Sequence, residues 1–87
     1  MCDITIGSAV YSRAGRDKGG LFLVVGISGD CVYLSDGDTR KIEKPKKKKL
    51  KHLNRTNFVS ESIKEACAKG EVENHMIRKA LAELKPI

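Results

Sequence analysis

The sequence predicts a mainly β fold with added α structure: a small barrel or sandwich over residues 1–56, followed by a helical hairpin over 57–87. Short apolar runs bounded by Gly, Asp and Ser occupy the first forty residues, which is typical of short strands joined by tight turns. A lysine run follows at 46–49, and beyond Phe58 the apolar spacing becomes helical. A chain of 87 residues has room for one compact core and a short appendage.

The strand-like runs lie at 9–13, 21–27 and 31–34. Gly29 and Asp30 separate the second run from the third closely enough to form a hairpin loop, and a second turn is expected at 35–38. The strands are therefore expected to meander, each beside its neighbour in sequence.

The segment 45–54 is expected first to interrupt this pattern and then to complete it. Pro45 has no amide donor and the charges of 46–49 repel one another, which predicts a solvated loop or an edge. Because apolar side chains return at Leu50 and Leu53, residues 50–54 are predicted to be the last strand, which closes the barrel.

The first predicted helix follows Phe58. Ser60 or Ser62 is a suitable N-cap, and Gly70 stands where a left-handed glycine ends a helix. The residues that share one face of this helix are Ile63, Ala66 and Cys67.

The second predicted helix begins near Glu73 or Asn74, either of which is expected to cap it, and Pro86 stops it. Its apolar residues recur at spacings of three and four: Met76, Ile77, Ala80, Leu81 and Leu84. The apolar faces of both helices must be buried against each other, against the barrel or against a partner.

The net charge of +6 comes from one segment of the chain. Residues 1–39 carry three basic and five acidic side chains, residues 40–55 nine and one, and residues 56–87 five of each. Cations that neutralise phosphates release condensed counterions and gain affinity without a shaped pocket. Polyanions are therefore the first partners to expect.

The three cysteines, Cys2, Cys31 and Cys67, are odd in number and far apart, so neither a disulfide framework nor a zinc site is expected. Cys31 and Cys67 are predicted to be small core residues. No signal-like segment or long apolar run occurs in the sequence. These features predict a cytoplasmic protein with no membrane association.

The most informative stretch is a polar loop between the first two predicted strands. Gly15 and Gly19 suit a turn that needs positive φ, and the same short loop carries the cations Arg13, Arg16 and Lys18. Residues 8–27 resemble the KOW motif, in which a strand, a loop with glycines at this spacing and an apolar strand begin an SH3-like barrel.

The resemblance extends to the runs 12–19, 35–45 and 48–53, about two thirds of the chain. Together they look like the small bacterial KOW-domain proteins related to the fourteen-e type of archaeal and eukaryotic ribosomal protein. The resemblance implies an SH3-like barrel that binds structured RNA, such as ribosomal RNA. It also implies association with the ribosome and contact with ribosomal proteins. The basic segment 40–55 is consistent with phosphate contact on electrostatic grounds alone.

The expected RNA-contacting residues are Arg13, Arg16, Lys18, Arg40, Lys41, Lys44, Lys46, Lys47, Lys48, Lys49, Lys51 and His52, with Gly15 and Gly19 as structural turn residues. Tyr11 and Tyr33 are able to stack on bases, but an aromatic ring in a strand of a small barrel is more often a core residue, so both are predicted to be core.

No catalytic or metal-binding pattern is expected in this chain. His52 and His75 lack neighbouring ligands, and Asp36 and Asp38 flank a turn glycine without a nucleophile nearby. No cofactor or small-molecule substrate is predicted. The main alternative to RNA binding is a protein-interaction module of a ribosome or transcription complex, because barrels of the KOW type also dock proteins and because the apolar stripe of the second helix is able to meet a partner. An enzyme acting on nucleic acid is the less favoured alternative.

Overall fold

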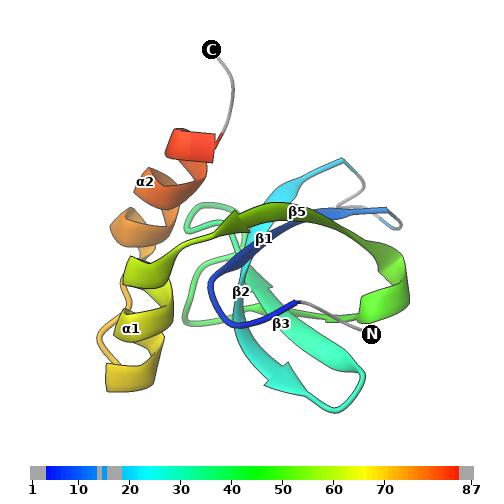
Figure 1. Cartoon of the computed structure of the whole chain (residues 1–87), viewed down its shortest axis with the longest axis horizontal. Helices are drawn as coiled ribbons and strands as arrows, with labels where there is room; N and C mark the ends of the chain where they lie inside the picture. The colour runs from blue at the N-terminus through cyan, green and yellow to red at the C-terminus, as the bar shows by residue number, and fades with distance from the viewer. Residues whose placement is uncertain (1–3, 14, 16–18, 85–87) are drawn as a thin grey trace.

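The computed structural model describes residues 4–13, 15 and 19–84, which form one antiparallel sheet and two helices (Figure 1). In chain order the elements are β1 (Ser8–Ser12), β2 (Leu21–Ser28), β3 (Cys31–Ser35), β4 (Lys46–Lys49), the 3₁₀ turn η1 (Leu50–His52), β5 (Leu53–Val59), α1 (Glu61–Lys69) and α2 (Asn74–Leu84). No helix among them is long and apolar enough to cross a bilayer.

The sheet has the strand order β4-β3-β2-β1-β5. The predicted meander and the hairpin at Gly29 and Asp30 are confirmed, since β2 pairs with β3 from Ser28 and Cys31 onward. β4 and β5 are the two edges of the ladder, so the sheet is open between them. The established fold is therefore mixed β and α, with an antiparallel sheet that hydrogen bonding does not close.

The lysine run and the predicted last strand differ from the sequence expectation. The four lysines form the edge strand β4, which pairs with β3, so of the two predicted possibilities the structure has the edge. The last strand does not cover 50–54. Residues 50–52 form η1 instead. The strand extends from Leu53 to Val59 because the backbone of this segment pairs with β1, although many of its side chains are polar.

The turn η1 connects the two edges of the sheet over only three residues. At its start the Leu50 amide donates to the Asp30 carbonyl (3.0 Å), and at its end the His52 carbonyl accepts from the Arg13 amide (2.8 Å). Irregular register within both β1 and β2 bends the sheet further. As a result the two edges of the ladder approach each other at this end.

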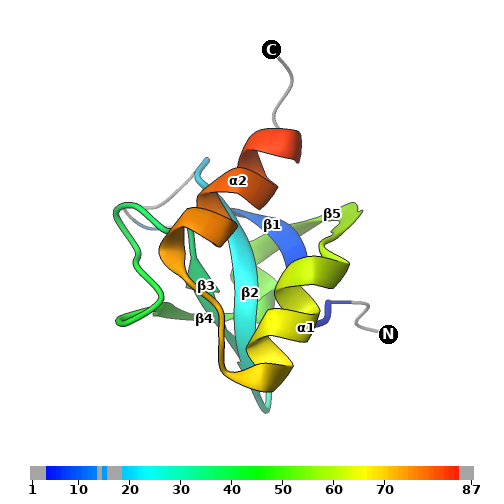
Figure 2. The ribbon, with the colours of Figure 1, turned by 90° about the vertical axis from the view of Figure 1, so that its left-hand side faces the viewer.

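Apolar side chains fill both faces of the sheet. One cluster lies within its curve and comprises Val10, Phe22, Val24, Val32, Leu34 and Leu53. The other lies between the sheet and the helices and comprises Ala9, Leu21, Leu23, Ile63, Ile77, Ala80 and Leu81. Figure 2 shows both helices in front of β2, so the helical layer shares a core with the sheet.

The two predicted helices are confirmed. Ser60 is the N-cap of α1, where its hydroxyl accepts from the Ile63 amide (3.3 Å), and Gly70 ends the helix at φ 70°. The apolar stripe of α2 is buried through Ile77 and Leu81 against the sheet. The position of the helices is therefore set by the core.

Candidate nucleic-acid interface

Two stretches that are distant in sequence meet at the end of the sheet next to η1: the end of β1 with the loop that follows it, and β4 with η1. The Arg13 amide bonds to the His52 carbonyl, which joins the end of β1 to η1. The Lys48 Nζ of β4 lies 3.3 Å from the point where a Cβ would stand on Gly15 in the β1–β2 loop. We call the side chains gathered here the basic end: Arg13, Lys48, Lys49, Lys51 and the imidazole of His52.

The lysines of β4 point alternately to the two faces of the strand. Lys46 and Lys48 are opposite the buried residues Leu34 and Val32, whereas Lys47 and Lys49 are opposite Tyr33 and Cys31. Lys48 is half-buried and the other three lysines are exposed. β4 therefore presents ammonium groups on both sides of one edge.

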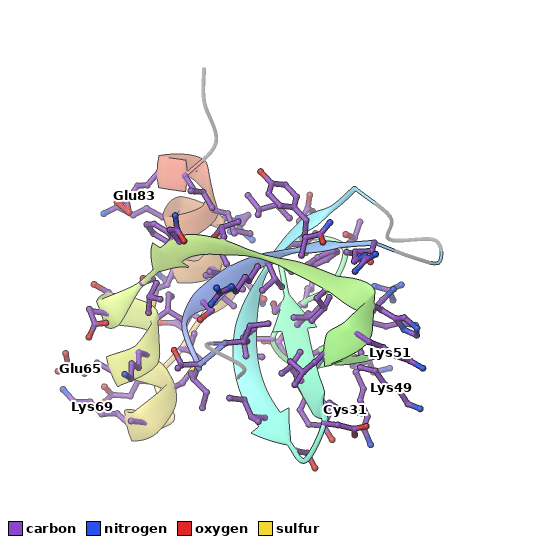
Figure 3. All side chains as sticks on the ribbon, turned by 45° about the vertical axis from the view of Figure 1, so that its right-hand side comes forward. Cys31, Lys49, Lys51, Glu65, Lys69 and Glu83 are labelled. Atoms are coloured by element: carbon purple, nitrogen blue, oxygen red, sulfur yellow. The ribbon has the colours of Figure 1, made fainter. Side chains whose placement is uncertain are left out.

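Figure 3 shows Lys49 and Lys51 projecting on the side of the molecule away from the helices. Glu65 and Glu83 are labelled on the helices, on the opposite side. Lys47, Lys49 and Lys51 form no ion pair with any carboxylate that the structure describes. Asp30 does lie beside Lys49 and Lys51 around a shallow hollow. The basic end thus gathers several cations, with the Asp30 carboxylate beside two of them.

The β1–β2 loop is organised by its glycines, as predicted. Gly15 and Gly19 have φ values of 78° and 85°, which residues with a Cβ rarely adopt. The Gly19 amide donates to the Ser12 carbonyl (2.8 Å), and the Ser12 amide donates to the Gly20 carbonyl (3.0 Å). Arg16 and Lys18, both predicted contacts, lie outside the described residues.

Of the remaining predicted cations, Lys46 and Lys47 lie in the first half of β4, and Arg40, Lys41 and Lys44 lie in the β3–β4 loop, which packs against α2. The Ile42 amide donates to Asn74 Oδ1 (2.8 Å), and Asn74 Nδ2 donates to Glu43 (3.0 Å). The loop leads into the start of β4 and η1 follows its end, about 13 Å away for four residues of strand. The structure therefore places the loop cations and the basic end at opposite ends of β4, with Lys46 and Lys47 between them.

Asp36 organises the β3–β4 loop. Partial burial by itself raises the pKa of Asp36, but bonds from the Arg40 and Asp38 amides (2.8 and 2.9 Å) and from the Thr39 hydroxyl outweigh burial and lower it. The Asn74 amide likewise lowers the pKa of the Glu43 carboxyl. The fold therefore favours the ionised forms of Asp36 and Glu43.

Two predictions about side-chain burial need correction. Tyr11 is not core, because 39% of it is exposed where the helices do not cover the sheet. Cys31 and Cys67 are only half-buried, since each lies at the margin of its element, although burial still raises the pKa of the Cys67 thiol. Tyr33 is also half-buried and packs against Gly26.

Arg55 on β5 is exposed and was missed as a candidate, although its position beyond His52 in the same basic segment was a usable signal. Within the residues that the structure describes, no three His, Cys, Asp or Glu side chains gather as metal ligands would. A scan against protein-family models finds no match for this chain, and a search of the curated proteins finds none similar to it. The role of the basic end is therefore inferred from its own charge and geometry.

Proposed function

We propose that this chain is an RNA-binding protein of the KOW type that associates with the ribosome and holds structured RNA by noncovalent contact at its basic end. The observation that carries the proposal is the approach of Lys48 Nζ to Gly15, which joins the β1–β2 loop and the lysine strand in one surface. Cations from separate segments on one surface are suited to bind consecutive phosphates of one RNA.

Electrostatic attraction to phosphates is enough for this surface to bind RNA. If about six cations meet phosphates, log affinity falls with log salt at a slope of about −5 for a duplex and about −4 for a single strand. Lysines act as flexible point charges, whereas an arginine such as Arg13 is able to form bidentate contacts and to stack on a base. The surface is therefore expected to recognise RNA shape more than sequence.

The fold is consistent with an SH3-like barrel, which is part of the same proposal. Five short antiparallel strands, two bends in the central strands and a three-residue turn between the edge strands favour a barrel whose edges come close without pairing. The glycine loop at the end of β1 is where the KOW resemblance places RNA contact.

The alternative of a protein-interaction module is less favoured. One form of it uses the apolar stripe of α2 as a docking surface, but Ile77 and Leu81 of that stripe are 0% and 4% exposed against the sheet. Little of the stripe is left for a partner. At the basic end, in contrast, Arg13, Lys49 and Lys51 are exposed and Lys48 is half-buried.

The proposal is tested by the salt dependence of RNA binding. We would compare the parent with a variant in which Lys46, Lys47, Lys48 and Lys49 are changed to Gln, using a labelled ribosomal RNA hairpin. Removing these four cations, of which Lys48 and Lys49 belong to the basic end and Lys46 and Lys47 adjoin it on β4, should make the slope shallower by up to about 3 and weaken binding by up to about a hundredfold at physiological salt. A variant with Lys64, Lys69 and Lys79 of the helices changed to Gln is the matched control and should bind like the parent.

Equal affinity of the β4 variant and the parent would overturn the proposal, provided that both unfold at similar temperatures. Association with the ribosome is tested separately by crosslinking the protein to RNA in cells and sequencing the bound RNA. Ribosomal RNA should dominate the parent sample and be depleted in the β4 variant. Recovery of unrelated transcripts in both samples would contradict ribosome association.

A further inference from the structure

The outer face of β1 and β5 carries a group of polar and aromatic side chains that phosphate contact does not use. Tyr11 is directly opposite Asn54 in the antiparallel register. The bond from the Arg13 amide to the His52 carbonyl continues the same register by one more backbone pair, into η1. Tyr11, Asn54 and Arg13 therefore share one face, and His52 of η1 lies beside Arg13.

This face is open where the rest of the sheet is covered. Tyr11 is also opposite Leu21 of β2 and so belongs to the face on which the helices pack. Leu21 is 8% exposed, but Tyr11 is 39% exposed, and Asn54, Arg13 and His52 are exposed too. The helical layer therefore ends before it reaches this corner of the sheet.

The spacing of the four side chains suits a planar ligand. Directly opposed Cβ atoms lie about 5 Å apart, and the next pair on the same face follows about 7 Å along the strands. A ring stacked on Tyr11 would therefore have its edge within reach of the Asn54 amide and the Arg13 guanidinium. Amide and guanidinium groups bond to base edges, and tyrosine stacks on every base through its π-face.

We propose that the pairs Tyr11–Asn54 and Arg13–His52 form a platform on which one unpaired base of the bound RNA stacks. The proposal rests on RNA binding at the basic end, since Arg13 and His52 belong to both surfaces. It adds the class of RNA: a bulge, loop or single strand whose phosphates continue toward Lys51. A base in a regular duplex is already stacked and does not reach this face.

Charge favours RNA over a protein as the occupant. Lys51 lies next to His52 in sequence and is an exposed cation. An apolar protein segment would leave Arg13, His52 and Asn54 without partners at its centre, which opposes burial. An acidic peptide satisfies the charges but offers no flat ring for Tyr11, so it serves as the competing ligand in the test.

Tyrosine fluorescence provides a direct readout, because the chain has two tyrosines and no tryptophan. In a Tyr33→Phe background Tyr11 is the sole emitter, and a base stacked on it quenches its emission. We would titrate this protein with an unpaired uridine octamer, with an RNA duplex of equal charge and with an acidic octapeptide. Quenching by the single strand alone is expected.

The affinity measurement uses Tyr11→Ala in the same titrations. Loss of one stacked base should weaken single-strand binding roughly tenfold to a hundredfold without changing the salt slope, while duplex binding stays as in the parent. Tyr11→Phe keeps the ring and should restore most of the affinity. Val59→Ala removes another exposed apolar side chain from the same strand pair and is the matched control.

The outcomes separate the two proposals. If both RNAs bind but neither quenches Tyr11 and Tyr11→Ala binds like the parent, the platform is wrong and RNA binding at the basic end stands. If neither RNA binds, RNA binding itself is wrong. Quenching by the peptide and not by RNA would overturn both and identify an acidic protein partner.

Discussion

The β3–β4 loop and the β4–η1 segment are neighbours in sequence but differ in charge and in how they are held: residues 36–45 carry three basic and three acidic side chains, and residues 46–52 carry five lysines and no carboxylate. The loop is tied to α2 through Asn74, which bonds to Ile42 and Glu43, and through Arg78, which donates to the Gly37 carbonyl. Most lysines of β4 are exposed, with their backbone paired to β3. The backbone of the first region is anchored to α2, whereas the lysine side chains of the second region lie mostly in solvent.

This contrast indicates that a basic segment is not one functional unit. In the loop, bonds to Asp36 and Asn74 fix the path of the backbone, so changes there should mainly alter stability. In β4 the backbone pairing is independent of the side chains, so changes there should mainly alter binding. The predictions below test this division.

The largest effect is expected from Gly37→Ala. Gly37 has φ 73°, and a Cβ there would collide with the Asn74 backbone carbonyl. The strained backbone and the displaced helix should together cost about 3 kcal/mol of unfolding free energy, measured by urea titration. Gly29→Ala is the control, since Gly29 has a similar φ of 61° but open space around it, and about 1 kcal/mol is expected there. Equal losses at both positions would show that the contact with α2 is unimportant.

A smaller loss of stability is expected from Asn74→Ala. The substitution removes the acceptor of the half-buried Ile42 amide and the donor to Glu43, which should cost about 1 to 2 kcal/mol. The loss of stability is measured as a lower midpoint temperature of thermal unfolding. Asn57→Ala, at an exposed position of β5, should change stability by less than about 0.5 kcal/mol. A larger loss at Asn57 than at Asn74 would contradict the anchoring role of the loop.

The Asp36 bonds should make the anchor sensitive to acid. The pKa of Asp36 is lower in the folded protein than in the unfolded chain, so its contribution is complete above about pH 5 and is lost as the pH falls below about 4. Asp36→Asn should be less stable than the parent by up to about 1 kcal/mol at pH 6, and this difference should shrink at pH 3. Asp38→Asn, in the same loop, is the control; a difference for Asp36→Asn that grows on acidification would refute the assignment.

The sequence predicts the elements better than it predicts the site. Apolar spacing and the signals at Ser60 and Gly70 are local, so both helices and the first three strands follow from them. The length of β5 does not, because Asn54 and Asn57 are poor strand formers and β5 pairs with β1 only once the sheet exists. The contact of Lys48 with Gly15 depends on the curvature of the whole sheet, and the exposure of Tyr11 depends on where the helices stop.

The smallest effect is expected when the loop cations themselves are neutralised. Changing Arg40, Lys41 and Lys44 to Gln removes nearly as many charges as the β4 variant, but from a group about 13 Å from η1 along β4. At physiological salt this lies beyond the screening length of about 8 Å, so RNA affinity should fall by less than about fivefold. The measurement is the same hairpin titration used for β4. A loss as large as that of the β4 variant would show that RNA contacts both groups, and the division between anchor and binding surface would then be wrong.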